Sequence, residues 1–179
     1  MKIRAAFVLS ALSAVFLPGT ASADDKVRAR LTGYQEVPSV STVASGSFEA
    51  TIHPDGQAFD WVLEYSGLQG NVTQAHIHFA QRHVNGNIVV WLCQTAANPG
   101  PAGTAMCPQS GRVTGTAMAG NVGPGSATQQ LTAGEITEVI AAMRAGAAYA
   151  NVHTSISPGG GIRGQINGRG RGDDRDHRH

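Results

Sequence analysis

The chain has few cysteines, few aromatic residues and few charges, and each shortage argues against a class of protein. Its 179 residues include 2 cysteines, 6% aromatic and 14% charged residues, and the net charge is +1. A general nucleic-acid binder, which needs a basic stripe, is therefore disfavoured. A redox or zinc site built from cysteines is disfavoured as well, because no C-x-x-C spacing occurs. Glycine, with 23 residues, is abundant and is typical of many short strands joined by tight turns.

Long apolar runs are missing beyond the first residues of the chain. Two basic residues precede an apolar run over 5–17, and small residues at 21–23 form a cleavage site. The run is too short to span a membrane, so residues 1–23 are predicted to be a secretory signal peptide. The mature chain starts near Asp24 and contains 11 basic and 12 acidic residues. We expect one exported domain over 24–167, in the periplasm or the medium, with no membrane span.

The two cysteines both lie in the exported part. An even pair in an oxidising compartment is most simply a disulfide, here between Cys93 and Cys107. The intervening stretch is rich in proline and glycine and is predicted to be a loop. Closing it stabilises the fold by about 3 kcal/mol in the chain-entropy model. Residues 168–179 are charged and glycine-rich, and are predicted to be a disordered tail.

Most of the mature chain alternates apolar and polar residues with a period of two, which predicts β-strands. The clearest hairpin joins 45–52 to 59–65 through a His-Pro-Asp-Gly turn. One segment differs: Thr132 and Glu135 match a capping box, and apolar residues then recur at helical spacing as far as Gly146. The fold class predicted is mainly β, an antiparallel Greek-key-like β-sandwich with one short helix over 133–145 lying across it.

A histidine pair on one of these strands is the main candidate for a site. Side chains at His76 and His78 share a face and lie about 7 Å apart along the strand. A third imidazole from a neighbouring strand, His153, completes a set that suits copper or zinc, since neutral imidazole ligates both. The alternative is that the three histidines only satisfy hydrogen bonds within the sheet. Both interpretations stay open on the residues alone.

Three further polar residues are candidates to support the histidines. Gln74 shares the strand face of His76, and Asn151 shares that of His153, so either is placed to orient a ligand. Arg163 is a lone charge in an otherwise uncharged strand. It is expected to pair with Glu36 or Glu64, or to hold an anion beside the histidines.

Four motifs in order resemble those of the CHRD domain, a module named for chordin that also occurs in exported bacterial proteins. They are Leu31-Thr32-Gly33 with Gln35-Glu36-Val37-Pro38, Ala75-His76-Ile77-His78, Asn151-Val152-His153-Thr154 and Gly161-Ile162-Arg163-Gly164-Gln165-Ile166. The resemblance covers roughly 27–166 and implies an extracellular β-sandwich without established catalytic residues. It also implies a distant similarity to copper/zinc superoxide dismutase, whose paired copper ligands the histidine strand resembles.

The expected function is an exported, non-catalytic binding or structural module. No nucleophile elbow, zinc-protease helix or phosphate loop occurs in the sequence, so no catalytic residue is predicted. The predicted domain contains five histidines, at positions 53, 76, 78, 83 and 153, which are too few for a dinuclear copper/zinc centre. This disfavours the alternative of a superoxide dismutase-like oxidoreductase. Copper or zinc is the one cofactor that the residues suggest. The expected partner is an extracellular protein or a small ligand, with no nucleic acid.

Overall fold

The computed structural model describes residues 25–168, and eight strands account for about two-fifths of them. The predicted signal peptide, 1–23, lies outside the described residues, as does the predicted tail apart from Gly168. That residue ends the last strand. The strands are β1 (Lys26–Thr32), β2 (Ser45–Ile52), β3 (Ala58–Ser66), β4 (Val72–Phe79), β5 (Asn87–Cys93), β6 (Gly111–Met118), β7 (Ala148–Thr154) and β8 (Ile162–Gly168). The helices are α1 (Ile136–Ala145) and three short 3-10 turns, η1 (Gly33–Gln35), η2 (Ala119–Asn121) and η3 (Ala127–Gln129).

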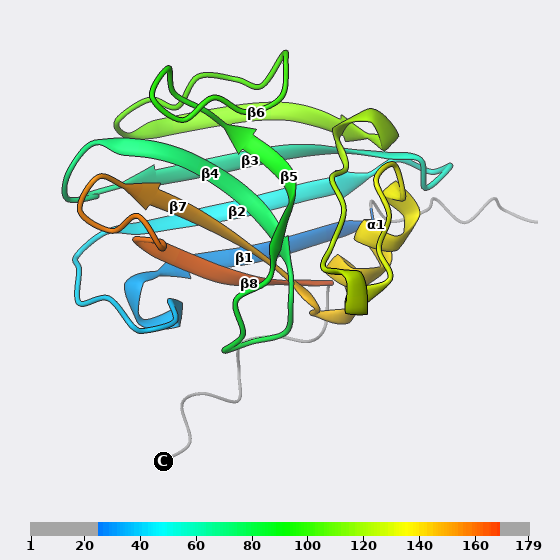
Figure 1. Ribbon diagram of the computed structural model, residues 1–179, viewed down its shortest axis with the longest axis horizontal. Helices are drawn as coiled ribbons and strands as arrows, with labels where there is room; N and C mark the ends of the chain where they lie inside the picture. Colours follow the sequence, from blue (N-terminus) through cyan, green and yellow to red (C-terminus); the bar gives the residue numbers. More distant parts are fainter. Residues whose placement is uncertain (1–24, 169–179) are drawn as a thin grey trace, which may run out of the picture.

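All eight strands belong to one sheet, in the order β5-β4-β7-β8-β1-β2-β3-β6. Every neighbouring pair is antiparallel. The sheet curls until its two end strands approach each other (Figure 1). An isolated bridge joins Val90 on β5 to Val122 just after β6, and Gly123 N–H donates to the carbonyl of Val89 at 2.9 Å. The result is a nearly closed barrel, which leaves little unpaired strand edge.

The prediction of a mainly β fold with one helix is confirmed. The two-sheet sandwich with Greek-key connections is not: one continuous sheet runs from β5 to β6. The period-two pattern does not distinguish the two arrangements, because it predicts which residues face the core and not whether the strands form one sheet or two. A curled sheet and a pair of packed sheets bury the same alternate residues.

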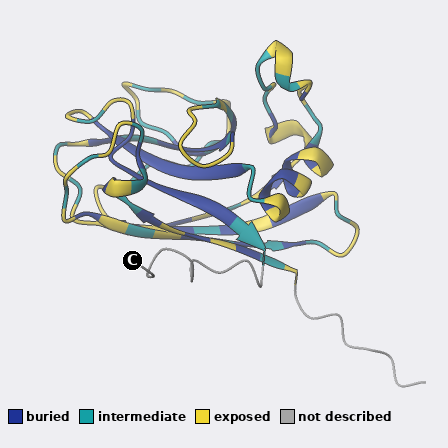
Figure 2. Cartoon of the chain, turned by 90° about the horizontal axis from the view of Figure 1, so that it is seen from below, coloured by how far each residue is buried: buried dark blue, intermediate teal, exposed yellow. Residues whose placement is uncertain are grey.

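The core fills the inside of the barrel. The predicted hairpin of β2 and β3 buries one face, with Phe59 and Leu63 fully inaccessible to solvent. From the opposite wall, Ile77 on β4 and Ile162 on β8 are equally inaccessible. Figure 2 shows buried segments along the strands, whereas the exposed residues gather on loops and on the outer side of the helix.

Helix α1 packs at one end of the barrel, against β7 and β8 (Figure 1). It begins at Ile136, three residues later than predicted, because Gly134 takes a positive φ of 91° that is incompatible with a helical turn. The Glu135 carboxylate still accepts a bond from the Thr132 N–H at 2.6 Å, but Glu135 itself occupies the N-cap position. The helix ends as predicted, with Gly146 in the left-handed conformation at φ 74°.

The outer side of the barrel has two very different faces. We call the outer side of β4, β7 and β8 the covered face, because its polar residues are buried beneath loops. Those residues are His76, His78, Tyr149, Asn151, His153, Arg163 and Gln165. We call the outer side of β1, β2, β3 and β6 the open face, whose polar residues are mostly exposed to solvent.

Candidate functional site

The three predicted histidines meet on the covered face. β4 and β7 are neighbours, and their antiparallel register sets His76 opposite Asn151 and His153 opposite Gln74. The ring centroid of His76 lies 5.5 Å from that of His78 and 5.0 Å from that of His153. One ring nitrogen from each histidine lies within 4.8 Å of the others. The predicted convergence is therefore present, and the role of the three residues as metal ligands stays a prediction.

Backbone carbonyls orient two of the imidazoles. His78 Nδ1 lies 2.9 Å from the Gly86 carbonyl, and His153 Nδ1 lies 2.9 Å from the Pro158 carbonyl. A carbonyl oxygen only accepts hydrogen bonds, so each Nδ1 carries the proton and each Nε2 keeps its lone pair. This is the orientation in which histidines usually bind metals, with the second nitrogen donating to a carbonyl.

The remaining ring nitrogens of the three histidines have few hydrogen-bond partners. His76 Nδ1 lies 3.2 Å from His153 Nε2, and it must be the donor because that Nε2 has no proton. His76 Nε2 and His78 Nε2 are buried and have no hydrogen-bond partner. Buried polar atoms without a partner are uncommon in folded proteins and call for an explanation such as a bound ion.

Burial keeps all three imidazoles neutral. Desolvation, reinforced by His153 and His78, lowers the pKa of His76 to about 2. Desolvation also lowers the pKa of His78 to about 4, against the opposing effect of its bond to Gly86. The pKa of His153 is lowered by burial too. At neutral pH no proton competes for the free lone pairs, which is the state that binds a metal.

The two residues predicted to support the histidines, Gln74 and Asn151, differ in burial and in contacts. Asn151 is buried, and its Oδ1 lies 3.0 Å from His153 Nε2. Gln74 is only half-buried and makes no side-chain hydrogen bond within the described part of the chain. Asn151 therefore contacts His153 directly, whereas the Gln74 side chain, opposite His153 in the register, forms no hydrogen bond with the histidines.

Arg163 lies on the covered face but does not form either predicted ion pair. Its guanidinium donates to the carbonyls of Gln81 and Val84, at 3.2 and 2.9 Å, and to Asn85 Oδ1 at 3.2 Å. Glu64 pairs with Arg112 on the open face instead. Side-chain patterns do not predict these partners, because they are mainly backbone carbonyls of a loop some 80 positions away.

Glu36 is a functional candidate that sequence reasoning underrated. Its side chain is 5% exposed, and one carboxylate oxygen is buried without a partner. Burial raises the pKa of Glu36 to about 7, although the positive charge of Arg163 acts in the opposite direction. An ideal Cβ on Gly160 would lie 2.4 Å from this carboxylate, so only glycine fits there. Glu36 therefore lies against the same loop whose Pro158 carbonyl orients His153.

Aromatic side chains that the sequence analysis missed form the walls of the histidine cluster. Tyr149 stacks on His78 with 4.7 Å between centroids, and Arg163 lies 3.4 Å above the tyrosine ring. Trp91 contacts His76 edge-on at 4.3 Å. The alternation along β7 could have identified Tyr149, which is two positions from Asn151 on the same face.

The predicted disulfide between Cys93 and Cys107 is present. The loop that it closes packs on Trp91, since an ideal Cβ at Gly100 would lie 2.6 Å from the indole ring. Because Trp91 in turn contacts His76, the loop is part of the cover over the cluster. The disulfide thus supports the covered face as well as the end of β5.

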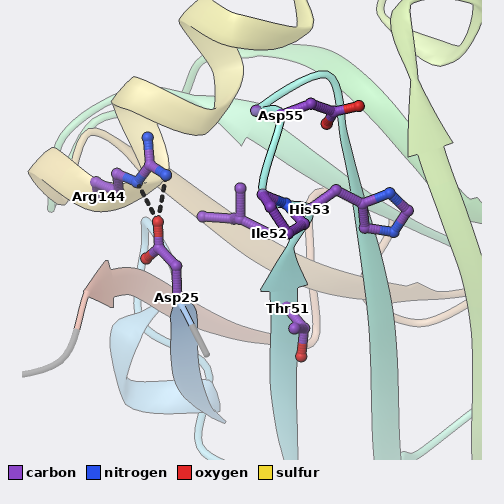
Figure 3. Close-up of a pocket in the computed structure, with 8 residues that line it drawn as sticks. Asp25, Thr51, Ile52, His53, Asp55 and Arg144 are labelled. Atoms are coloured by element: carbon purple, nitrogen blue, oxygen red, sulfur yellow. Dashed lines mark hydrogen bonds and ion pairs between the residues drawn. The ribbon is translucent and has the colours of Figure 1, made fainter. Parts of the chain in front are cut away.

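A separate pocket lies away from the three histidines. It is lined by the start of β1, the turn between β2 and β3, and the end of α1 (Figure 3). Arg144 and Asp25 form an ion pair there, so their charges offset each other. His53 borders this pocket and bonds Asp60 at 3.0 Å, and His83 lies exposed in a loop. Neither histidine belongs to the cluster.

No helix in the described part of the chain has the length and apolar character needed to span a membrane.

The whole barrel from β1 to β8 corresponds to one known domain type. The family model for the CHRD domain matches residues 27–166, which is more than three quarters of the chain. This range contains all four sequence motifs and all three clustered histidines. No curated protein and no solved structure matches the chain, so the distant similarity to copper/zinc superoxide dismutase stays a prediction. The match over most of its length shows that the chain belongs to the CHRD domain family.

Proposed function

We propose that the protein is an exported, non-catalytic binding module that holds one copper or zinc ion through His76, His78 and His153. The observation that carries the proposal is that the Nε2 atoms of His76 and His78 are buried without a hydrogen-bond partner, apart from an interaction of His78 with the Asn151 side chain. A hydrogen-bond cluster built only for stability satisfies its buried nitrogens. A site that receives a cation keeps lone pairs free.

The spacing of the nitrogens fits an ion. Two nitrogens bound to one tetrahedral zinc lie about 3.3 Å apart, and His76 Nδ1 and His153 Nε2 are separated by 3.2 Å. To ligate through Nδ1, His76 moves its proton to the Nε2 that now has no partner. The largest separation among the three ligand atoms, within 4.8 Å, requires a small closing movement of the rings. Asn151 Oδ1 adds a further lone pair 3.0 Å from His153 Nε2. A cation at this point, or a rotated amide, removes the repulsion between these two atoms.

A mononuclear centre is favoured over the dinuclear centre of a dismutase. Among residues 25–168, His76, His78 and His153 are the one group of three or more potential metal-binding side chains that lie close together. A copper/zinc pair needs a second group and a bridging imidazole. We therefore expect the copper-loaded protein to show no dismutase activity above that of the metal-free protein.

Export is supported by the disulfide, because such bonds persist in oxidising compartments. It also agrees with the predicted signal peptide over 1–23. We propose that the mature chain acts in the periplasm or the medium, where a small ligand or another extracellular protein is its partner.

The test is metal uptake by the purified full chain, followed by elemental analysis and thermal unfolding. We expect one ion per chain and, at metal concentrations 100-fold above Kd, a melting temperature raised by roughly 5 °C or more. His76→Ala should abolish uptake, whereas His53→Ala, at the exposed histidine bonded to Asp60, should not change it. Absence of uptake by the unmodified protein would overturn the proposal. Uptake that survives in His76→Ala would assign the metal to another site.

A further inference from the structure

The charge around the three-histidine cluster is unusual for a site that takes a divalent ion. All three candidate ligands are neutral imidazoles, and no carboxylate or thiolate belongs to the group. Arg163, 1% exposed, lies over the ring of Tyr149, which stacks on His78. The nearby buried acid, Glu36, forms no ion pair with this arginine within the described residues. A cation bound to His78 therefore has a buried positive charge one aromatic ring away.

The space around the cluster is also restricted. His76 is fully inaccessible to solvent, Trp91 packs on its edge, and the ring of Tyr149 covers one side of His78. A further potential ligand atom beside the histidines is Asn151 Oδ1, a neutral amide oxygen. Such a site offers three good nitrogen ligands and only a weak fourth one.

We propose that this site selects the cuprous ion, Cu(I), over Zn(II) and Cu(II). The inference rests on the proposed function and names the ion that the same site takes. Zinc sites in proteins are almost always four-coordinate, and they are commonly completed by an anionic ligand or water. Cu(I), like Zn(II), has a filled d shell without a geometric preference of its own, but three neutral ligands are sufficient for it.

Electrostatic repulsion from Arg163 also favours Cu(I) over the divalent ions. The repulsion between a bound ion and the Arg163 guanidinium is proportional to the charge of the ion, so it is twice as large for Zn(II) or Cu(II) as for Cu(I). In the partly buried surroundings of the covered face this repulsion is weakly screened. The positive charge of Arg163 thus disfavours divalent ions more than the monovalent ion.

A substitution that changes only the charge of the weak ligand tests this account. Asn151→Asp has nearly the same shape and supplies an anionic oxygen beside His153. We expect it to raise the affinity for Zn(II) relative to that for Cu(I) by at least about tenfold, since it offsets Arg163 and completes a tetrahedral site. Asn121→Asp, in the exposed turn η2, adds the same charge away from the cluster and should leave the ratio unchanged.

The experiment measures binding of Cu(I) and Zn(II) to the full chain without oxygen, by competition with chromophoric chelators. Cu(I) is supplied as its acetonitrile complex, so no reductant acts on the disulfide. We expect Cu(I) to bind at least about 100-fold more tightly than Zn(II), and Arg163→Gln to narrow that difference. Arg163→Lys, which keeps the charge, is the folding control.

The outcomes separate this inference from the proposed function. Zinc binding equal to or tighter than Cu(I) binding would overturn the inference and leave the metal site in place. An unchanged affinity ratio in Asn151→Asp would overturn it as well. If neither ion binds the unmodified protein, both the inference and the proposed function are wrong.

Discussion

The covered face and the open face belong to one sheet and both carry arginine, but they differ in almost every other respect. On the open face, Arg28 pairs with Glu49 at 2.7 Å and Arg112 pairs with Glu64 at 3.4 Å, all four side chains being more than one-third exposed. On the covered face, Arg163 and His76 are at most 1% exposed. Water surrounds the first set of charges and loops surround the second.

The difference shows that burial, more than residue type, decides what a polar side chain contributes. Exposed ion pairs are typically worth less than about 1 kcal/mol, because water solvates the separated charges almost as well. A buried polar group depends wholly on its partners, and losing one costs several times more. The candidate functional residues accordingly lie on the covered face, where loops separate the polar side chains from solvent.

The largest difference should appear when one arginine is removed from each face. Arg163→Met should lower the free energy of unfolding by about 2–3 kcal/mol, because two loop carbonyls and the Asn85 amide oxygen lose their charged donor. Arg112→Met should lower it by less than about 1 kcal/mol. Chemical denaturation of both variants measures this. Equal losses for the two arginines would remove the distinction between the faces.

The next contrast concerns two glutamates and the effect of pH. The pKa of Glu36 is raised from 4.5 to about 7 in the folded state, so between these values the unfolded state releases a proton that the folded state retains. Stability then falls as the pH rises, by about 3 kcal/mol in total. Glu36→Gln should remove this decline. Relative to the unmodified protein, its unfolding free energy should be nearly equal at pH 4 and higher by about 3 kcal/mol at pH 8.

The matched control for this prediction is Glu64→Gln, at an exposed glutamate of the open face. It should shift the unfolding free energy by no more than a few tenths of a kcal/mol at either pH. A Glu36→Gln variant with the same pH profile as the unmodified protein would show that Glu36 ionises normally.

Among the histidines, His78 taken alone should produce a smaller effect in the opposite direction. The pKa of His78 falls from 6.5 to about 4 on folding, so below pH 6.5 the unfolded state binds a proton that the folded state does not. Stability therefore decreases as the pH falls, by about 2 kcal/mol at pH 5 from this residue. The unfolding free energy of His78→Phe, whose ring can still stack on Tyr149, should decrease less steeply as the pH falls in metal-free buffer. If the unfolding free energy of this variant falls as steeply with decreasing pH as that of the unmodified protein, the titrating group is not His78.

The smallest effect is expected on the open face, where Glu49 accepts from Arg28 and also lies 3.3 Å from Lys26. Glu49→Gln should cost less than about 1 kcal/mol, and the loss should shrink further in 1 M salt because exposed charges are screened. Denaturation at low and high salt provides the measurement. A large, salt-independent loss would mean that this face is less solvated than its exposure indicates.

The same contrast explains how much was predictable from sequence. Alternation along β4 placed His76 and His78 together, and the cysteine count gave the disulfide, because both depend on local or pairwise rules. The lone charge of Arg163 predicts a pair with Glu36 or Glu64, or a bound anion, but β3, which carries Glu64, and β8 lie on different parts of the barrel. The cover over the histidines comes from loops whose backbone carbonyls have no signature in the sequence.

Histidine ¹⁵N NMR of the full chain, recorded before and after addition of one equivalent of Cu(I), shows whether the three clustered histidines bind the ion. Before addition, His78 and His153 should carry their protons on Nδ1, as the bonds to Gly86 and Pro158 require. After addition, ring nitrogens of His76, His78 and His153 should shift together, while those of His53 and His83 stay in place. Shifts confined to other histidines, or none at all, would contradict the account.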